Sequence, residues 1–288
     1  MTTGLHSPSG VVITGSSTGI GAACALALDK RGFRVFAGVR SPEDGRRLKE
    51  QASDRLTPVI FDVTDEPSIA AAAAEVGEVL GDAGLAGLVN NAGIVVPGPL
   101  EIVPLDKLRL QFDVNVIGQI AVTQAFLPLL RAGKGRIVNM SSISGLVAPP
   151  FLGPYAASKF ALEALSDALR SELRKWGISV SVIEPGNVAT PIWEKTRTAA
   201  EKEGRTMPPE AVALYQEDMD AVRKTTQRFG ENAMPVERVV RAVVHALCSR
   251  RPKIRYPVGG QTRLAAWARK WIPDRIRDWY IRRELGLR

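Results

Sequence analysis

The chain has 288 residues, of which 45% are hydrophobic and 24% are charged. It can therefore bury a large core, and its composition excludes an intrinsically disordered protein. Two cysteines exclude a disulfide framework and a cysteine-built zinc site, and two histidines argue against a Ser-His-Asp triad or a histidine-based metal site.

The net charge of +8 is concentrated at the end of the chain. Between Arg250 and Arg288 there are 12 Lys/Arg against 3 Asp/Glu, which leaves the remainder close to neutral. The basic isoelectric point therefore describes a tail, and we expect no nucleic-acid partner. The N-terminal residues lack the apolar run of a secretory signal, and no stretch reaches the roughly 18 apolar residues of a membrane span. We expect a cytoplasmic protein.

Short apolar runs alternate with stretches of helical periodicity. In chain order, the pattern predicts a strand at 9–14, a helix at 19–31, a strand at 34–39, a helix at 43–52, a strand at 57–61, a helix at 66–80, a strand at 85–90, helices near 105–131, a strand at 135–141, a helix at 154–176, a strand at 178–183, a helix at 235–249 and a strand at 253–258. Strand–helix alternation with right-handed crossovers predicts an α/β fold, a Rossmann-type doubly wound parallel sheet of about seven strands.

We expect a single dinucleotide-binding catalytic domain at 1–260, followed by a C-terminal helical extension at 261–288. The polar stretch 187–234 is long for a simple connection and is predicted to be an active-site lid, with an ordinary surface excursion as the alternative. Apolar residues that could line a substrate pocket are Pro149, Pro150, Phe151, Leu152, Ile192, Trp193, Met207, Tyr215 and Met219.

A glycine-rich turn, TGSSTGIG, lies between the first strand and the first helix. Gly15 permits a tight turn, Gly19 lets the backbone approach a diphosphate at the helix N-terminus, and Gly21 allows close packing of the helix. The spacing is GxxxGxG rather than GxGxxG, and a purely structural loop is the alternative. Residues that end the third and fourth strands also suit a dinucleotide: Asp62, Val63, Asn90, Asn91, Ala92 and Gly93.

The second strand ends at Arg40, where a carboxylate for a ribose 2′-hydroxyl is absent. The planar guanidinium suits a 2′-phosphate instead, so we predict that NADP(H) is preferred over NAD(H). The alternative is a solvated arginine that points away from the cofactor.

Tyr155 and Lys159 are four residues apart in YAASK, so both lie on one face of a predicted helix. A phenol is a poor base near neutral pH, but a neighbouring ammonium stabilises the phenolate and lowers its pKa. Tyr155 could then exchange a proton with a substrate oxygen. The Ser142 hydroxyl, at the end of the fifth strand, could hydrogen-bond the same oxygen. Asn115, a polar residue inside an apolar helix, suggests a backbone perturbation or a bound water, with a satisfied core amide as the alternative.

In combination, these motifs resemble the short-chain dehydrogenase/reductase family in its short single-domain branch. The resemblance runs from Gly10 to about Gly186 and rests on TGSSTGIG, DV, NNAG, NVIG, YAASK and Pro185-Gly186, which occur in that order. It implies catalytic roles for Ser142, Tyr155 and Lys159, and a proton relay through water at Asn115. The cofactor positions that it implies are Gly15, Ser17, Ile20, Arg40, Asp62, Val63, Asn91, Tyr155, Lys159, Pro185, Gly186, Val188 and Thr190, the last for the carboxamide.

The family resemblance also sets the expected activity. The VFAGVR strand and the long C-terminal region are similar to hydroxysteroid and retinol dehydrogenase-like members, which implies a lipophilic secondary alcohol or ketone as substrate. Thr18 stands where some NADP-using members carry a basic residue. A non-catalytic cofactor-binding regulatory protein and a 3-oxoacyl thioester reductase remain as alternatives. Members of the family form homodimers or homotetramers, and we expect the same here through the helices near 105–131 and 154–176.

The extension at 262–288 carries apolar residues at helical spacing among Arg and Lys. A basic amphipathic helix with Trp can lie on an anionic membrane surface. The same pattern is compatible with packing on the chain's own domain or on a second subunit. The sequence leaves these three alternatives open.

Overall fold

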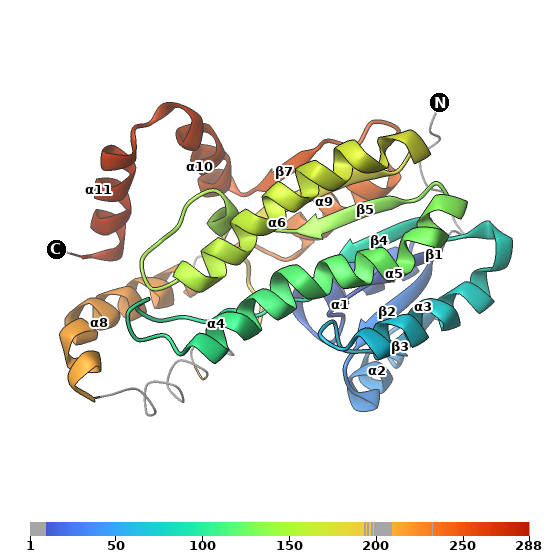
Figure 1. Ribbon diagram of the computed structural model, residues 1–288, viewed down its shortest axis with the longest axis horizontal. Helices are drawn as coiled ribbons and strands as arrows, with labels where there is room; N and C mark the ends of the chain where they lie inside the picture. Colours follow the sequence, from blue (N-terminus) through green and yellow to red (C-terminus); the bar gives the residue numbers. More distant parts are fainter. Residues whose placement is uncertain are drawn as a thin grey trace.

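A seven-stranded parallel sheet forms the centre of the molecule (Figure 1). The computed structural model describes residues 10–192, 194, 196, 198, 209–231 and 233–287. The strand order is β3-β2-β1-β4-β5-β6-β7. The strands are β1 (Gly10–Ile13), β2 (Arg34–Val39), β3 (Leu56–Ile60), β4 (Gly87–Asn90), β5 (Arg136–Met140), β6 (Ser179–Pro185) and β7 (Arg255–Val258). The predicted fold class is confirmed.

Helices cover both faces of the sheet, because each of the strands β1 to β6 is joined to the next by a crossover. The helices are α1 (Gly19–Asp29), α2 (Pro42–Lys49), α3 (Glu66–Leu80), α4 (Leu105–Phe112), α5 (Gly118–Ala132), α6 (Gly153–Glu172), α8 (Pro209–Glu231), α9 (Glu237–Cys248), α10 (Gly260–Trp271) and α11 (Asp274–Leu285). Shorter helical turns are η1 (Gly81–Ala83), η2 (Asp113–Ile117), η3 (Ile143–Gly145) and η4 (Leu173–Trp176).

Two hydrophobic clusters sandwich the sheet. Alternate residues of β1 point to opposite faces, so that Val11 packs with α1 and α9, whereas Val12 packs with α3 and α5. The central strands β1, β4 and β5 are buried along their whole length, as expected for a parallel sheet covered on both sides. This explains why these strands are continuous apolar runs in the sequence.

The order of the strands reverses at β1, which pairs with β2 on one side and β4 on the other. The crossovers from β1 and β4 leave in opposite directions, and a crevice opens outside the carboxyl ends of these two strands. In Figure 1 the strand arrows point toward the side of the molecule where α4, α8 and α10 lie. The fold therefore places a binding crevice at that edge.

Within the described residues, one helical stretch, Leu105–Ala132, passes the length and composition test for a membrane span. The sequence analysis expected none, so that expectation is corrected. The side chains of Val122, Phe126 and Leu130 in this stretch are fully buried in the second hydrophobic cluster. The stretch is therefore a core helix that lies against the sheet, and its apolar composition reflects that packing.

The region expected to be a lid contains a long helix, α8, which the polar sequence did not predict. The ends of the region are tied together, because the Ala189 N–H donates to the Met234 carbonyl and the Met234 N–H donates to the Asn187 carbonyl. Two further helices, α10 and α11, follow β7 and extend beyond the sheet (Figure 1).

Candidate active site

A cleft of about 320 Å³ lies at the carboxyl edge of the sheet. It collects nearly all of the residues that the sequence assigned to cofactor binding, although they come from segments far apart in the chain. The predicted residues on its walls are Gly15, Ser17, Gly19, Ile20, Arg40, Asp62, Val63, Asn91, Ala92, Gly93, Ser142, Tyr155, Lys159, Pro185, Gly186, Val188 and Thr190. Gly21 and Asn115 lie behind these walls.

The glycine turn is shaped by backbone that side chains would obstruct. Gly15 and Gly19 have φ angles of +66° and +61°, which favour glycine. A Cβ on Gly21 would lie 2.2 Å from the Gly15 carbonyl oxygen. The turn can therefore fold back on the first turn of α1 and leave the N-terminus of α1 facing the cleft, where backbone N–H groups are free to bind an anion.

Hydrogen bonds join the turn to the end of β4. The buried Thr14 hydroxyl accepts the N–H groups of Asn91 and Ala92, each at 2.9 Å. The Asn91 amide donates to the Thr14 and Gly15 carbonyls at 3.0 and 3.1 Å. These bonds explain the asparagine after β4, and they hold the glycine turn at a fixed distance from the neighbouring strand. The sequence analysis did not single out Thr14, although it begins the TGSSTGIG motif.

The end of β2 places Arg40 at the mouth of the cleft. Its guanidinium is exposed, and it has no hydrogen-bond or ion-pair partner among the residues that the structure describes. Opposite, Asp62 accepts two hydrogen bonds from Thr64, at 2.9 Å from the N–H and 2.8 Å from the hydroxyl. A planar cation is thus available for an anionic group bound in the cleft.

Tyr155 and Lys159 project from the first turns of α6 into the cleft. The Lys159 Nζ lies 5.7 Å from the centre of the Tyr155 ring and donates to the Met140 carbonyl at 2.7 Å. Burial lowers the pKa of Lys159 to about 8, against the attraction of Glu163. Burial raises the pKa of Tyr155, and the hydrogen bond between its phenol and the Ser142 hydroxyl acts in the opposite direction. The predicted serine–tyrosine–lysine arrangement is therefore present in one place.

Ser142 is held where β5 ends. Its hydroxyl accepts the Ser144 N–H at 3.1 Å and begins the short turn η3. The adjacent Ser141 also lines the cleft, but the hydrogen bond to Tyr155 belongs to Ser142. The serine that the sequence singled out at the end of the fifth strand is therefore the one that contacts the Tyr155 phenol.

Asn115 lies in η2, a single π-helical turn between α4 and α5. Its amide carbonyl accepts the Ile94 N–H at 2.9 Å, and its amide nitrogen donates to the Ile94 carbonyl at 3.0 Å and to the Ser158 hydroxyl at 3.1 Å. The predicted backbone perturbation is present as this π-helical turn, and the buried amide is also satisfied by protein partners, as the alternative held. These contacts fix the loop that carries Gly93, where a Cβ would lie 3.8 Å from the Lys159 Nζ.

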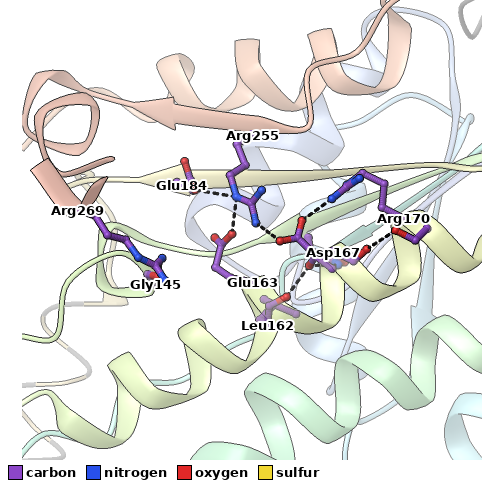
Figure 2. Close-up of polar contacts among 11 residues, drawn as sticks. Gly145, Leu162, Glu163, Asp167, Arg170, Glu184, Arg255 and Arg269 are labelled. Atoms are coloured by element: carbon purple, nitrogen blue, oxygen red, sulfur yellow. Dashed lines mark hydrogen bonds and ion pairs between the residues drawn. The ribbon is translucent and has the colours of Figure 1, made fainter. Parts of the chain in front are cut away.

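A charge cluster joins α6, β6 and β7 around the buried carboxylates of Glu163 and Glu184 (Figure 2). The Arg255 Nε of β7 lies 3.0 Å from a Glu163 oxygen and 3.6 Å from a Glu184 oxygen, and its Nη2 lies 2.8 Å from Asp167. Burial, with the neighbouring Glu163 carboxylate, raises the pKa of Glu184 to about 7. The sequence analysis missed this cluster. Its only local signal is that Glu163 follows Lys159 by one helical turn.

Most of the apolar residues that were predicted to line the substrate pocket do not line the cleft. Of those in the described part of the chain, only Ile192 lines the cleft. Phe151 instead packs edge-on against Tyr215 of α8, with ring centres 6.3 Å apart, and the Tyr215 hydroxyl hydrogen-bonds Glu101. Trp193 and Met207 lie outside the described residues.

Comparison with known proteins identifies the family to which the chain is similar. The family model for short chain dehydrogenase matches residues 9–201. The chain is 37% identical to an NADPH-dependent 3-dehydrocapnine reductase from Ornithobacterium rhinotracheale, over 93% of this chain and 94% of that protein. It is 39% identical to 17-beta-hydroxysteroid dehydrogenase type 6 from Bos taurus, over 95% and 87%.

A solved structure shares the same architecture. The short chain dehydrogenase from Burkholderia cenocepacia in complex with NADP superposes with a TM-score of 0.72 and 26% identity, over 94% of this chain and 97% of that one. Together with the cleft and the serine–tyrosine–lysine arrangement, these matches show that the chain belongs to the short-chain dehydrogenase family of oxidoreductases.

Proposed function

We propose that the protein interconverts a lipophilic secondary alcohol and its ketone with NADP(H) as the cofactor. The observation that carries the proposal is the meeting of Ser142, Tyr155 and Lys159 in the cleft that the glycine turn borders. Two relatives support the proposal: one is named as an NADPH-dependent reductase, and the other is named as a hydroxysteroid dehydrogenase.

The cleft suits a dinucleotide because glycines line part of it, so that a ligand there can approach the backbone closely. At Gly15 a Cβ would lie 2.8 Å from Ala92 Cα, and at Gly19 it would lie 3.4 Å from the Thr190 side chain. The free N–H groups of α1 would hold the diphosphate, and Lys159 and Thr190 would hold the nicotinamide end. Arg40 would pair with a 2′-phosphate. A bound nicotinamide supplies or accepts the hydride.

The side chains of this protein supply the rest of the chemistry. Ser142 and Tyr155 bind the substrate oxygen, which places the reacting carbon over the cofactor site. The Tyr155 phenol donates its proton to that oxygen as the ketone is reduced, and it takes the proton back during oxidation. The Lys159 ammonium would stabilise the phenolate, and the Ser142 hydrogen bond opposes the effect of burial on the Tyr155 pKa. Asn115 and Ser158 hold the neighbouring loop, and in the proposed relay a water at Asn115 passes the proton toward solvent.

The apolar part of the cleft favours a lipophilic substrate. Ile94, Leu110, Val114 and Ile192 line it on the side of α4 and of the region that follows β6. In this proposal the region 187–234 acts as a lid over the substrate. Leu105 of α4 and Ile117 of η2 are exposed and do not line the cleft, and we propose that the face formed by these elements joins two copies in a homo-oligomer.

A substrate panel with both cofactors tests the proposal. Purified protein is assayed with steroid, retinoid, fatty and small ketones and with acyl thioesters, using NADPH and NADH. We expect turnover of lipophilic ketones with a higher kcat/KM for NADPH. Turnover confined to acyl thioesters would support the thioester reductase instead, and cofactor binding without turnover of any substrate would support the regulatory protein.

The role of Arg40 has its own test. In Arg40→Ala the KM for NADPH should rise about ten- to hundredfold, the range expected for a lost charge-assisted hydrogen bond. The KM for NADH should change little, since NADH lacks the 2′-phosphate. Arg34, an exposed arginine at the start of the same strand, serves as the control in Arg34→Ala. If NADH is the preferred cofactor of the wild type, the assignment of Arg40 is wrong.

A further inference from the structure

The C-terminal helices α10 and α11 expose an unusual amount of large apolar surface. In α10 the side chains of Leu264, Trp267 and Trp271 are 56%, 56% and 71% exposed. In α11 those of Ile276, Trp279 and Tyr280 are 54%, 58% and 51% exposed. Scattered exposed apolar residues are ordinary, but six in two consecutive helices form a surface that requires a partner.

These residues occupy the outer side of each helix. In α10, Leu264, Trp267 and Trp271 follow helical spacing on one face. The inner face carries the fully buried Thr262. It also carries Arg269, whose guanidinium donates to the Gly145 carbonyl at 3.2 Å (Figure 2). The amphipathic pattern of α10 is thus inverted relative to a helix that packs on its own domain, where the large apolar face would point inward.

The second helix repeats the arrangement. Ile276, Trp279 and Tyr280 share one face of α11, while the buried Leu285, nine residues after Ile276, lies half a turn away. Thus α11 is anchored through its inner side, and the Thr225 hydroxyl of α8 lies 3.5 Å from the Leu285 carbonyl. Of the three alternatives that the sequence left open, packing on the chain's own domain explains the inner faces but leaves both aromatic faces uncovered.

The charge of this segment selects among the possible partners. Residues 260–288 contain eight Lys/Arg and three Asp/Glu. The exposed arginines of the two helices include Arg263, Arg275, Arg282 and Arg283, and the Arg283 guanidinium lies 5.3 Å from the Trp279 ring. A second copy of the same surface would oppose positive charge with positive charge. A surface of anionic lipid headgroups over an apolar interior matches both features.

We propose that the outer faces of α10 and α11 dock the protein on anionic lipid membranes. The tryptophan and tyrosine rings enter the headgroup region, where their amphipathic rings are favoured, and the arginines pair with lipid phosphates. The protein then lies on the bilayer rather than across it. This inference does not rest on the proposed function, since it uses no residue of the active-site cleft.

The two helices that would contact the membrane also contact the loop beside the active site. Arg269 joins α10 to the turn η3, whose N-cap residue is Ser142. A cavity of about 200 Å³ separates the segment 146–148 from α10 and α11, and Ile281 of α11 lines it. Docking through the outer faces would therefore place α10 and α11 between the bilayer and the loop that follows Ser142, so that the helices connect the membrane contact to the site.

Vesicle sedimentation of the full chain tests the proposal. We compare vesicles of phosphatidylcholine alone with vesicles that also contain phosphatidylserine, at low and high salt. We expect binding to the anionic vesicles, little binding to the neutral ones and weakening by salt. The double variant Trp271→Gln/Trp279→Gln should lower the partition coefficient at least about tenfold, because it removes two aromatic rings that the membrane would bury. Arg275→Glu with Arg282→Glu should do the same.

A matched control distinguishes binding through this surface from non-specific binding through any exposed tryptophan. Trp176 is also partly exposed and lies beside Arg131 and Lys175, but it belongs to η4, outside the two helices. Trp176→Gln should bind vesicles like the wild type, and circular dichroism should show that all the variants are folded. Absence of binding to anionic vesicles, or equal binding by the Trp271/Trp279 variant, overturns the proposal. So does concentration-dependent self-association that the same variant abolishes, because the occupant would then be a second copy.

Discussion

The wild-type protein should lose stability as the pH rises from acidic to alkaline, and replacement of Glu184 by glutamine should abolish this loss. Glu184 is 1% exposed, and burial, together with the Glu163 carboxylate, raises its pKa from an ordinary 4.5 to about 7. Arg255 and Arg269 oppose this rise but do not cancel it. The carboxyl group therefore holds a proton in the folded protein at pH values where the unfolded chain has already released it.

The sign and size of the effect follow from proton linkage. Between pH 4.5 and about 7 the folded state binds more protons than the unfolded state at this site, so the free energy of unfolding falls as pH rises. At about 1.36 kcal/mol per pH unit, this interval corresponds to a loss of about 3 kcal/mol. The contribution is absent in Glu184→Gln, because an amide does not titrate.

Urea unfolding of the wild type and Glu184→Gln, at about pH 5 and about pH 8, measures the effect. Relative to the wild type, the variant should gain about 3 kcal/mol between the acidic and the alkaline measurement. Glu172→Gln is the control, since Glu172 is exposed at the end of the same helix that carries Glu163. A difference between variant and wild type that is independent of pH, or that favours the wild type at alkaline pH, refutes the reasoning.

Two further substitutions test the frame of the cleft. Gly21→Ala should lower the free energy of unfolding by about 1–3 kcal/mol and weaken cofactor binding, because the new Cβ would lie 2.2 Å from the Gly15 carbonyl oxygen. Gly77→Ala is the control: its Cβ would have its closest contact at 3.5 Å, and it should stabilise its helix by about 0.5–1 kcal/mol. Thermal unfolding and cofactor titration compare the two variants. Thr14→Val should cost about 2–4 kcal/mol, since two backbone N–H groups lose their buried acceptor. Thr14→Ser should recover most of that stability, and failure to do so would show that the methyl group matters more than the hydroxyl.

The parts of the fold that follow a local period were predictable from the sequence. The strand at 34–39 and the helix at 66–80 have the predicted bounds, because a short apolar run and a helical repeat can each be recognised in consecutive residues. The glycine turn was predictable for the same reason, since its demands on backbone conformation select glycine. By contrast, α8 lies in a stretch that is polar on average, and its helix was not predicted.

Contacts between distant segments were not predictable in this way. Arg255 meets Glu163 and Glu184 only because β7 pairs with β6 and α6 packs beside both strands. The exposed aromatic faces of α10 and α11 were visible as a helical pattern, but which side faces the domain depends on Thr262 and Leu285, which carry no such signal by themselves. The sequence thus specified the polar residues of the cleft better than the surfaces around it.

The most direct test of the central claim is the turnover of Tyr155→Phe. The substitution removes one hydroxyl from a half-buried ring and leaves Lys159, Ser142 and the glycine turn in place. With NADPH and the best ketone of the panel, kcat should fall by several orders of magnitude, since the proton donor is lost, while the dissociation constant for NADPH stays within about twofold. A variant that retains the wild-type kcat would contradict the assignment of the phenol as the acid and base of the reaction.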